Sequence, residues 1–287
     1  MAHILDGKMV AAKVKREVAE ILKANDLHAS LAVVLVGDDL ASHIYVEHKN
    51  KDCEECGVFC RTHWIDGNFK QDFVTNYVQS LAHNNDVDGI LVQLPLPEHM
   101  DAAKVLAEIP PEKDVDCFTT ANIGRLYSGD AFLKPCTPAG VMRLLDEYGI
   151  PLSGKHCVVL GRSNVVGKPM AQLLLDENAT VTVCHSKTEN LRDICRSADV
   201  LISAVGRPGL VTQDMVKDGA VIVDVGMNRD ADGKLCGDCT REAYEASHFY
   251  TPVPGGVGPM TRAMLMQNVM MAAANRRGLD LNYKGEN

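Results

Sequence analysis

The 287-residue chain has 29 Lys and Arg residues against 38 Asp and Glu residues, a formal net charge of −9, and 46% hydrophobic residues. This acidic balance argues against a general binder of nucleic acid or of anionic membranes, because both classes need a basic surface. No apolar run approaches the roughly 18 to 20 residues that span a bilayer, and the N-terminus resembles no targeting signal, so we expect a cytoplasmic protein with no membrane or nucleic-acid partner.

Ten cysteines are present, many of them in apolar runs such as residues 156–159. Reduced thiols in a cytosolic protein are the simplest interpretation. Two Cys-x-x-Cys pairs, Cys53/Cys56 and Cys236/Cys239, have the spacing of zinc ligands, which leaves a shared zinc site as an alternative. Nothing in the sequence brings the pairs together, and the first pair falls at i, i+3 on an expected helix, so we predict no metal.

Strand-like and helix-like segments alternate along the first half. We expect strands at 31–36, 58–65 and 89–94, with helices at 41–55 and 71–83 between them. Continuous apolar strands separated by helices are typical of a parallel sheet that is covered on both faces.

The same pattern starts again after a Pro- and Gly-bearing stretch at 135–154. We expect strands at 156–160, 180–184, 199–204, 220–225 and 249–253, and helices at 167–177 and 260–275. The prediction is therefore an α/β protein of two domains, residues 1–121 and 122–287, with a cleft between them. The C-terminal helix from about residue 262 is expected to pack back on the first domain.

A glycine-bearing turn follows the expected strand at 156–160. Gly161 stands where the chain must leave the strand sharply, and Gly167 stands where a helix would begin. The spacing Gly-x5-Gly differs from the usual Gly-x-Gly-x-x-Gly, so a plain strand-to-helix turn stays an alternative. The next strand ends without the carboxylate that binds the ribose 2′-hydroxyl in NAD enzymes; Ser186, Lys187 and the nearby Arg162 suit a 2′-phosphate, which favours NADP.

Polar residues gather at expected helix faces and strand ends in the first half. Tyr45 and Lys49 are i, i+4 neighbours on one helix face. Gln93 lies inside the apolar strand run at 89–94, where a buried amide needs a partner. Asp116 follows in the Lys-Asp-Val-Asp segment 113–116. Each feature has an ordinary structural explanation alone, but together they supply an aromatic ring, an ammonium, an amide and a carboxylate to one site.

Several short motifs span nearly the whole chain: Ile4-Leu5-Asp6-Gly7-Lys8, Ala41-Ser42-x-x-Tyr45-Val46-x-x-Lys49, Val92-Gln93-Leu94-Pro95-Leu96-Pro97, Lys113-Asp114-Val115-Asp116, Pro135-Cys136-Thr137-Pro138-x-Gly140, Gly161-Arg162-Ser163-x-x-Val166-Gly167-x-Pro169-Met170, His185-Ser186-Lys187-Thr188 and Thr251-Pro252-Val253-Pro254-Gly255-Gly256-Val257-Gly258-Pro259-Met260-Thr261. With these motifs the chain resembles the bifunctional methylenetetrahydrofolate dehydrogenase/methenyltetrahydrofolate cyclohydrolase family. The resemblance implies an N-terminal substrate domain, a C-terminal Rossmann-type NADP-binding domain, a tetrahydrofolate substrate and a homodimer formed through the cofactor domains.

The resemblance also implies a role for individual residues. Lys49 would be the catalytic lysine with Gln93 as its partner, Tyr45 would stack on the folate, and Asp116 would hold the pterin. The other implied positions fall into two groups. Gly256, Pro259 and Thr261 would line the folate site. The cofactor would be bound by Gly161, Arg162, Ser163, Gly167, Ser186, Gly206 and Met227.

Two positions depart from the family pattern. Cys117 replaces the usual glycine after the pterin-binding aspartate, which puts the aim of Asp116 in doubt. Met227 replaces the more usual isoleucine, a change between apolar side chains of similar size.

Two other functions stay open from the sequence. One is a monofunctional NADP-dependent dehydrogenase of the same family, although Lys49 and Gln93 argue for the hydrolase. The other is a non-catalytic NADP-binding redox module that uses the two Cys-x-x-Cys pairs, which would leave Tyr45, Lys49 and Gln93 unexplained.

Overall fold

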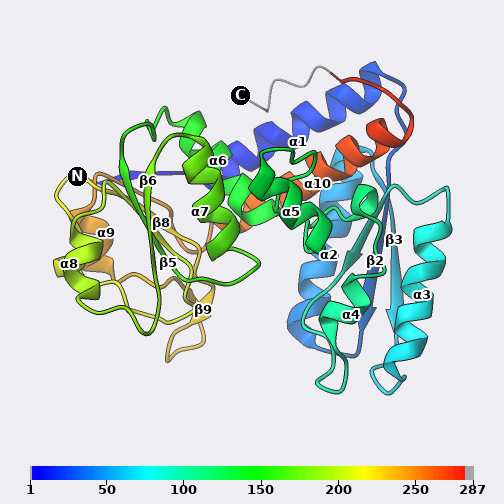
Figure 1. The fold of residues 1–287 in the computed structure, drawn as a ribbon, viewed down its shortest axis with the longest axis horizontal. Helices are drawn as coiled ribbons and strands as arrows, with labels where there is room; N and C mark the ends of the chain where they lie inside the picture. The colour runs from blue at the N-terminus through cyan, green and yellow to red at the C-terminus, as the bar shows by residue number, and fades with distance from the viewer. Residues whose placement is uncertain (1, 282–287) are drawn as a thin grey trace. The chain divides into compact units, whose positions relative to one another are not determined.

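The computed structural model describes residues 2–281, without the side chains of residues 40–45. Contacts divide the chain into two compact units (Figure 1). The first, here the six-stranded unit, comprises Met1–Ala11 and Thr137–Thr261; the second, here the three-stranded unit, comprises Ala12–Cys136 and Arg262–Asn287. The expected α/β class is confirmed, whereas the expected functional boundary near residue 121 stays a prediction.

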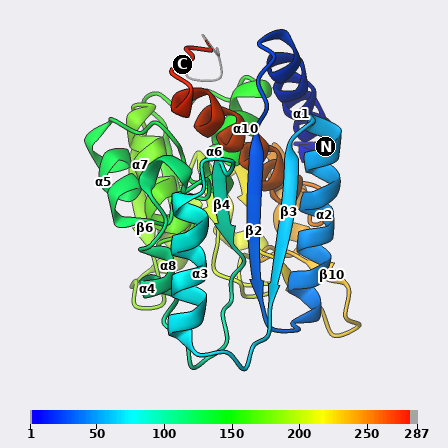
Figure 2. The same cartoon turned by 90° about the vertical axis from the view of Figure 1, so that its right-hand side faces the viewer.

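The three-stranded unit is built on a parallel sheet with the strand order β3-β2-β4 (Figure 2). Its strands are β2 (Ser30–Val36), β3 (Phe59–Ile65) and β4 (Gly89–Val92). Its helices are α2 (Leu40–Cys56), α3 (Gln71–His83), α4 (Ala102–Leu106), η1 (Pro111–Lys113) and α5 (Thr120–Ser128), together with most of α1 (Gly7–Ala24) and the C-terminal part of α10 (Val257–Arg276).

Helices cover both faces of this sheet, as the continuous apolar strands predict. Val74 and Val78 of α3 and Val105 of α4 belong to one core cluster with strand residues of β2 and β4. On the other face, Gly89 allows close packing: a Cβ there would stand 3.4 Å from Val269 of α10 and 2.7 Å from Val115. The sheet thus fixes where the β4 strand ends, and with it the position of Gln93.

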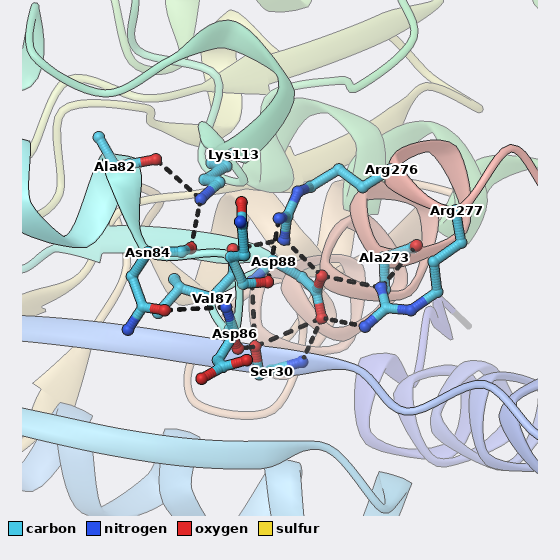
Figure 3. Close-up of polar contacts among 11 residues, drawn as sticks. Ser30, Ala82, Asn84, Asp86, Val87, Asp88, Lys113, Ala273, Arg276 and Arg277 are labelled. Atoms are coloured by element: carbon cyan, nitrogen blue, oxygen red, sulfur yellow. Dashed lines mark hydrogen bonds and ion pairs between the residues drawn. The ribbon is translucent and has the colours of Figure 1, made fainter.

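A buried charge cluster ties the end of α10 to the start of β4 (Figure 3). Asp88 is 1% exposed, and its Oδ1 accepts from Arg276 at 2.7 Å and from Arg277 at 2.8 Å. Its Oδ2 accepts from the Ser30 amide at 2.9 Å. Lys113 donates to the carbonyl oxygens of Ala82 and Asn84 in the same region. The bonds from Arg276, Arg277 and Ser30 compensate the cost of burying the Asp88 charge.

The six-stranded unit contains a parallel sheet with the order β1-β11-β8-β7-β5-β6. Its strands are β1 (His3–Ile4), β5 (His156–Leu160), β6 (Thr180–Cys184), β7 (Val200–Ser203), β8 (Val221–Asp224) and β11 (Phe249–Tyr250), with a separate hairpin of β9 (Asn228–Arg229) and β10 (Leu235–Cys236). The remaining elements are α6 (Cys136–Glu147), α7 (Gly167–Asp176), α8 (Leu191–Arg196), η2 (Gln213–Met215) and α9 (Arg241–Ala246).

This sheet is doubly wound, since the chain moves from β5 outward to β6 and then back past β5 to β7. Ligands of such sheets bind beyond the carboxyl ends of the strands where the direction reverses, here β5 and β7. The expected Rossmann-type fold is therefore confirmed, and the turn that begins at Gly161 lies at the reversal point.

Among the described residues, no helix combines the length and apolar character needed to cross a membrane.

Candidate functional site

A lysine–glutamine pair forms the centre of a polar site in the three-stranded unit. Lys49, on α2, donates from Nζ to Oε1 of Gln93 at 2.8 Å, and both side chains are half-buried. Gln93 in turn donates from Nε2 to the carbonyl oxygen of Leu94 at 2.7 Å. Since its amide is held at both ends, Gln93 orients the lysine without neutralising its charge.

The expectation that Gln93 lies within a strand is wrong. β4 ends at Val92, and Gln93 is the first residue beyond it. The backbone N–H of Gln93 donates to the Val34 carbonyl oxygen at 2.8 Å. Pro95 follows and has no N–H to extend the ladder. Gln93 thereby lies at a strand's carboxyl end, where open α/β sheets bind their ligands.

Asp116 lies in a turn that is held on its C-terminal side by a second carboxylate. Asp114 is 1% exposed and accepts from the amides of Phe118 at 3.1 Å and Thr119 at 2.9 Å. Cys117, which replaces the family's usual glycine, adopts a φ of 58° and is fully buried. The chain thus forms this turn with a residue type that rarely adopts a left-handed conformation.

The charges of Lys49 and Asp116 influence each other. Burial lowers the pKa of Lys49 from its ordinary value of 10.5, and the Asp116 charge opposes that fall. Burial raises the pKa of the Asp116 carboxyl, while Lys49 and the hydrogen bond to the Cys136 thiol lower it. A lysine whose pKa is lowered gives up its proton more readily than a free lysine and can therefore act as a base toward a bound substrate or water.

The remaining residues expected around the folate are placed separately. The Tyr45 side chain lies outside the described part of the structure, although its backbone belongs to α2. Gly256 immediately precedes α10, and Pro259 lies in its first turn. The Thr261 hydroxyl lies 2.9 Å from that of Thr137. Gly256, Pro259 and Thr261 belong to the six-stranded unit, so their action on one substrate with Lys49 is a proposal.

The glycine turn of the six-stranded unit leaves no room for side chains. Gly161 has a φ of 117°, and a Cβ there would stand 2.4 Å from the Ala204 carbonyl oxygen. A Cβ at Gly167 would stand 2.2 Å from the Gly161 carbonyl oxygen. The Ser163 hydroxyl accepts from the amides of Val166 at 3.1 Å and Gly167 at 3.3 Å, where α7 begins. This is the close backbone packing that a dinucleotide-binding turn requires, and Ser163 caps the start of α7.

Arg162 and Ser186 occupy matching positions beyond two neighbouring strands. β5 and β6 pair in parallel with Leu160 opposite Cys184, and each of the two polar residues is two positions past its strand. Both Arg162 and Ser186 are exposed. A guanidinium and a hydroxyl at adjacent strand ends suit a phosphate bound at this edge.

A pair of buried carboxylates supports the other loops at this edge. Asp238 is fully buried and accepts from the amides of Val205 at 2.9 Å and Arg207 at 2.8 Å, which flank Gly206. It also accepts from the side-chain amide of Asn228 at 2.9 Å, and Asn228 directly follows the half-exposed Met227. Asp224 accepts from the Asp238 amide at 3.0 Å. Asp238 thus fixes both segments that the sequence assigns to the cofactor.

All ten cysteines are free thiols, and the described residues contain no group of three or more His, Cys, Asp or Glu side chains arranged to hold a metal ion. Cys236 and Cys239 flank Asp238, whose hydrogen bonds explain that segment structurally.

Sequence reasoning missed three residues that shape these sites. The sequence pattern assigns no role to Asp238, and it gives Cys136 none beyond membership of the Pro135-to-Gly140 motif. Asn268 lies in a Met-rich helix, and it donates to the backbone oxygen of Val115, the residue before Asp116. Two adjacent amides, Gln267 and Asn268, within an apolar helical run were the signal that could have identified Asn268.

The fold and these residues define a class of protein: an α/β protein with a dinucleotide-binding fold and a separate lysine-centred polar site. The family models identify it further. Residues 5–116 match the tetrahydrofolate dehydrogenase/cyclohydrolase catalytic domain, and residues 135–277 match the NAD(P)-binding domain of the same name. The chain belongs to the tetrahydrofolate dehydrogenase/cyclohydrolase family.

Individual relatives agree over almost the full length. A protein of Campylobacter hominis named bifunctional protein FolD is 52% identical, covering 96% of this chain and 98% of its own. The bifunctional FolD structure from Campylobacter jejuni has a TM-score of 0.93 at 47% identity, covering 96% and 100%. A FolD structure from Trypanosoma brucei, complexed with NADP and an inhibitor, has a TM-score of 0.91 at 36% identity, covering 96% and 98%.

Proposed function

We propose that this protein oxidises 5,10-methylenetetrahydrofolate with NADP and hydrolyses the resulting 5,10-methenyltetrahydrofolate to 10-formyltetrahydrofolate. The observation that carries this proposal is the bond between Lys49 and Gln93 beside Asp116, in a chain of the tetrahydrofolate dehydrogenase/cyclohydrolase family. The relatives named bifunctional protein FolD support both activities in one chain.

The oxidation depends chiefly on positioning. Bound NADP would supply the hydride acceptor for the methylene carbon, and the two flanking nitrogens of the folate would stabilise the resulting cation. No strong base is needed, so the protein would contribute mainly by holding the folate and the nicotinamide in the correct relative position. We propose that Asp116 holds the pterin, that Tyr45 stacks on it, and that Gly256, Pro259 and Thr261 line the folate site.

The hydrolysis needs proton transfer, which we assign to Lys49. Water adds to the methenyl carbon and loses one proton to give a carbinolamine. The carbinolamine hydroxyl then loses its remaining proton as the formyl C=O forms, while one carbon–nitrogen bond breaks and its nitrogen gains a proton, so that one proton is released overall. A lysine of lowered pKa can accept the first proton and donate one to that nitrogen. The cationic substrate lowers the lysine pKa further, and Gln93 keeps the side chain aimed at the reacting carbon.

For the cofactor we propose binding by Gly161, Ser163 and Gly167 at the turn, with Gly206 and Met227 at the neighbouring loops. A Cβ at Gly161 or Gly167 would collide with the protein's own backbone, so both glycines are needed to form the tight strand-to-helix turn at which a pyrophosphate would bind. Residues 122–287 would form this NADP domain and residues 1–121 the folate domain, with the C-terminal helix from about residue 262 packed back on the folate domain. We further propose a cytoplasmic homodimer, which rests on the family resemblance.

The cyclohydrolase can be tested alone by giving the protein methenyltetrahydrofolate without NADP. We expect its absorbance to fall much faster than in an enzyme-free blank. A rate equal to the blank, with NADPH still formed from methylenetetrahydrofolate, would leave a monofunctional dehydrogenase.

The preference for NADP over NAD should shrink when Arg162 or Ser186 is replaced by alanine. A hydrogen bond to a charged group contributes about 1.5–3 kcal/mol, so Arg162→Ala should lower the ratio of the two kcat/KM values by about tenfold or more. The kcat/KM with NAD should change little, which serves as the internal control. An unchanged ratio in both variants would mean that the 2′-phosphate is recognised elsewhere.

The pH dependence of hydrolysis should follow the charge next to Lys49. In Gln93→Glu a carboxylate replaces the neutral amide and raises the lysine pKa, so the rise of kcat/KM with pH should move to higher pH. In Asp116→Asn the charge that raises the lysine pKa is removed, so the rise should move to lower pH. Profiles that keep the wild-type midpoint in both variants would exclude Lys49 as the titrating base.

A further inference from the structure

The carbonyl of Val115, the residue directly before Asp116, is held by two side chains. Asn268 Nδ2 donates to it at 2.8 Å, and the Cys136 sulfur lies 3.3 Å from it, so that the one thiol hydrogen is shared between this carbonyl and the Asp116 carboxyl. The same Asn268 nitrogen donates to the Lys134 carbonyl at 2.8 Å. Asn268 therefore joins the turn that bears Asp116 to the segment that leads into α6.

Asn268 occupies a position that favours an apolar side chain. It is 4% exposed, and its neighbours Val269 and Met270 on α10 are fully buried. Burying an amide is costly unless its N–H groups are bonded, and here both find backbone acceptors. A leucine would fill this site without needing hydrogen-bond partners. The presence of an amide here therefore indicates that its hydrogen bonds to the turn matter.

The turn that bears Asp116 contains an unfavourable backbone conformation, so a contact such as that of Asn268 would help to hold it. Cys117, on the other side of Asp116, has a φ of 58°, in a region that residues with a side chain rarely adopt. Asp114 holds the following residues through the amides of Phe118 and Thr119. Asp116 therefore lies between two anchored points, and Asn268 with Cys136 provides the anchor on its N-terminal side.

We propose that Asn268 is a positioning residue, which aims the Asp116 carboxylate at the folate by holding the Val115 carbonyl. The proposal deepens the function proposed above and rests on it for the identity of the substrate. It assigns Asn268 an effect on the folate through Asp116, with no contact between Asn268 and the reacting atoms.

A double-mutant cycle of Asn268→Leu and Asp116→Ala tests this assignment. Asn268→Leu should lower kcat/KM for methylenetetrahydrofolate roughly ten- to a hundredfold, as small misplacements of a positioned group do, with most of the loss in the KM for folate. The KM for NADP should stay within about twofold. The double variant should match Asp116→Ala within about threefold, because the two residues act in series. Multiplying effects would overturn the proposal.

Val78→Ala is the matched control, since it removes a buried contact from α3 in the same unit and should leave both KM values unchanged. A crystal structure of Asn268→Leu decides the positioning without any assay: a displaced Asp116 carboxylate supports it, and an unmoved one overturns it. Absence of turnover in the wild-type protein would refute the proposed function, whereas the carboxylate position would still decide the role of Asn268.

Discussion

Replacing Lys49 by methionine should lower the cyclohydrolase kcat by at least about 100-fold, since general acid–base groups contribute roughly 10²–10⁴-fold. Methionine keeps the length and apolar stem of the lysine but can neither accept nor return a proton. It also leaves the Gln93 Oε1 without the donor that now lies 2.8 Å away. The assay is the loss of methenyltetrahydrofolate absorbance in the absence of NADP.

Lys51→Met is the matched control for this variant, because Lys51 is an exposed residue of the same helix. It should retain wild-type hydrolysis. Dehydrogenase activity in Lys49→Met should fall less than hydrolysis, since hydride transfer needs no base. Normal hydrolysis in Lys49→Met would remove the lysine from the mechanism.

Replacing Asp88 by asparagine should lower the free energy of unfolding by about 3 kcal/mol, because breaking a buried ion pair typically costs 3–5 kcal/mol and the Arg277 side chain is partly exposed. The change leaves Arg276 and Arg277 facing a neutral amide in a region where Asp88 is 1% exposed (Figure 3). Urea unfolding followed by circular dichroism measures the difference.

Asp86→Asn is the control for this second variant, since Asp86 is an exposed acid two residues away and surface changes of this kind stay within about 0.5 kcal/mol. Equal stability of Asp88→Asn and the wild type would show that the cluster contributes no net stabilisation. Catalysis by the folded fraction should be preserved in both variants, because neither residue contacts the Lys49 site.

Local patterns explain why much of the fold could be predicted. The helix expected at 71–83 and the strands expected at 156–160 and 180–184 match the structure at both ends. Each of these segments keeps one pattern of apolar residues over its whole length and is bounded by turn-forming residues. The position of Gln93 was predicted less well, because β4 ends at Val92 although its partner β2 continues to Val36. Pro95 has no N–H to extend the ladder, but the apolar run at 89–94 does not show where pairing stops.

The features that escaped prediction depend on contacts between distant parts of the chain. β1 has only two residues and pairs with β11, which lies about 245 positions later. Asn268 acts on Val115, 153 positions away. Asp238 supports loops at 205–207 and 228, so its role is visible only when β7, β8 and the hairpin are assembled. Motif resemblance located Lys49, Gln93 and Asp116, but their mutual arrangement came from the structure.

The most direct test of the account is to mix the protein with 5,10-methylenetetrahydrofolate and NADP and to follow NADPH and methenyltetrahydrofolate absorbance together. We expect NADPH to form while methenyltetrahydrofolate stays low, because the same protein consumes it. In Lys49→Met, the residual oxidation should instead be accompanied by methenyl accumulation. No NADPH from the wild-type protein would contradict the proposed oxidation, and methenyl accumulation equal to NADPH would contradict the proposed hydrolysis.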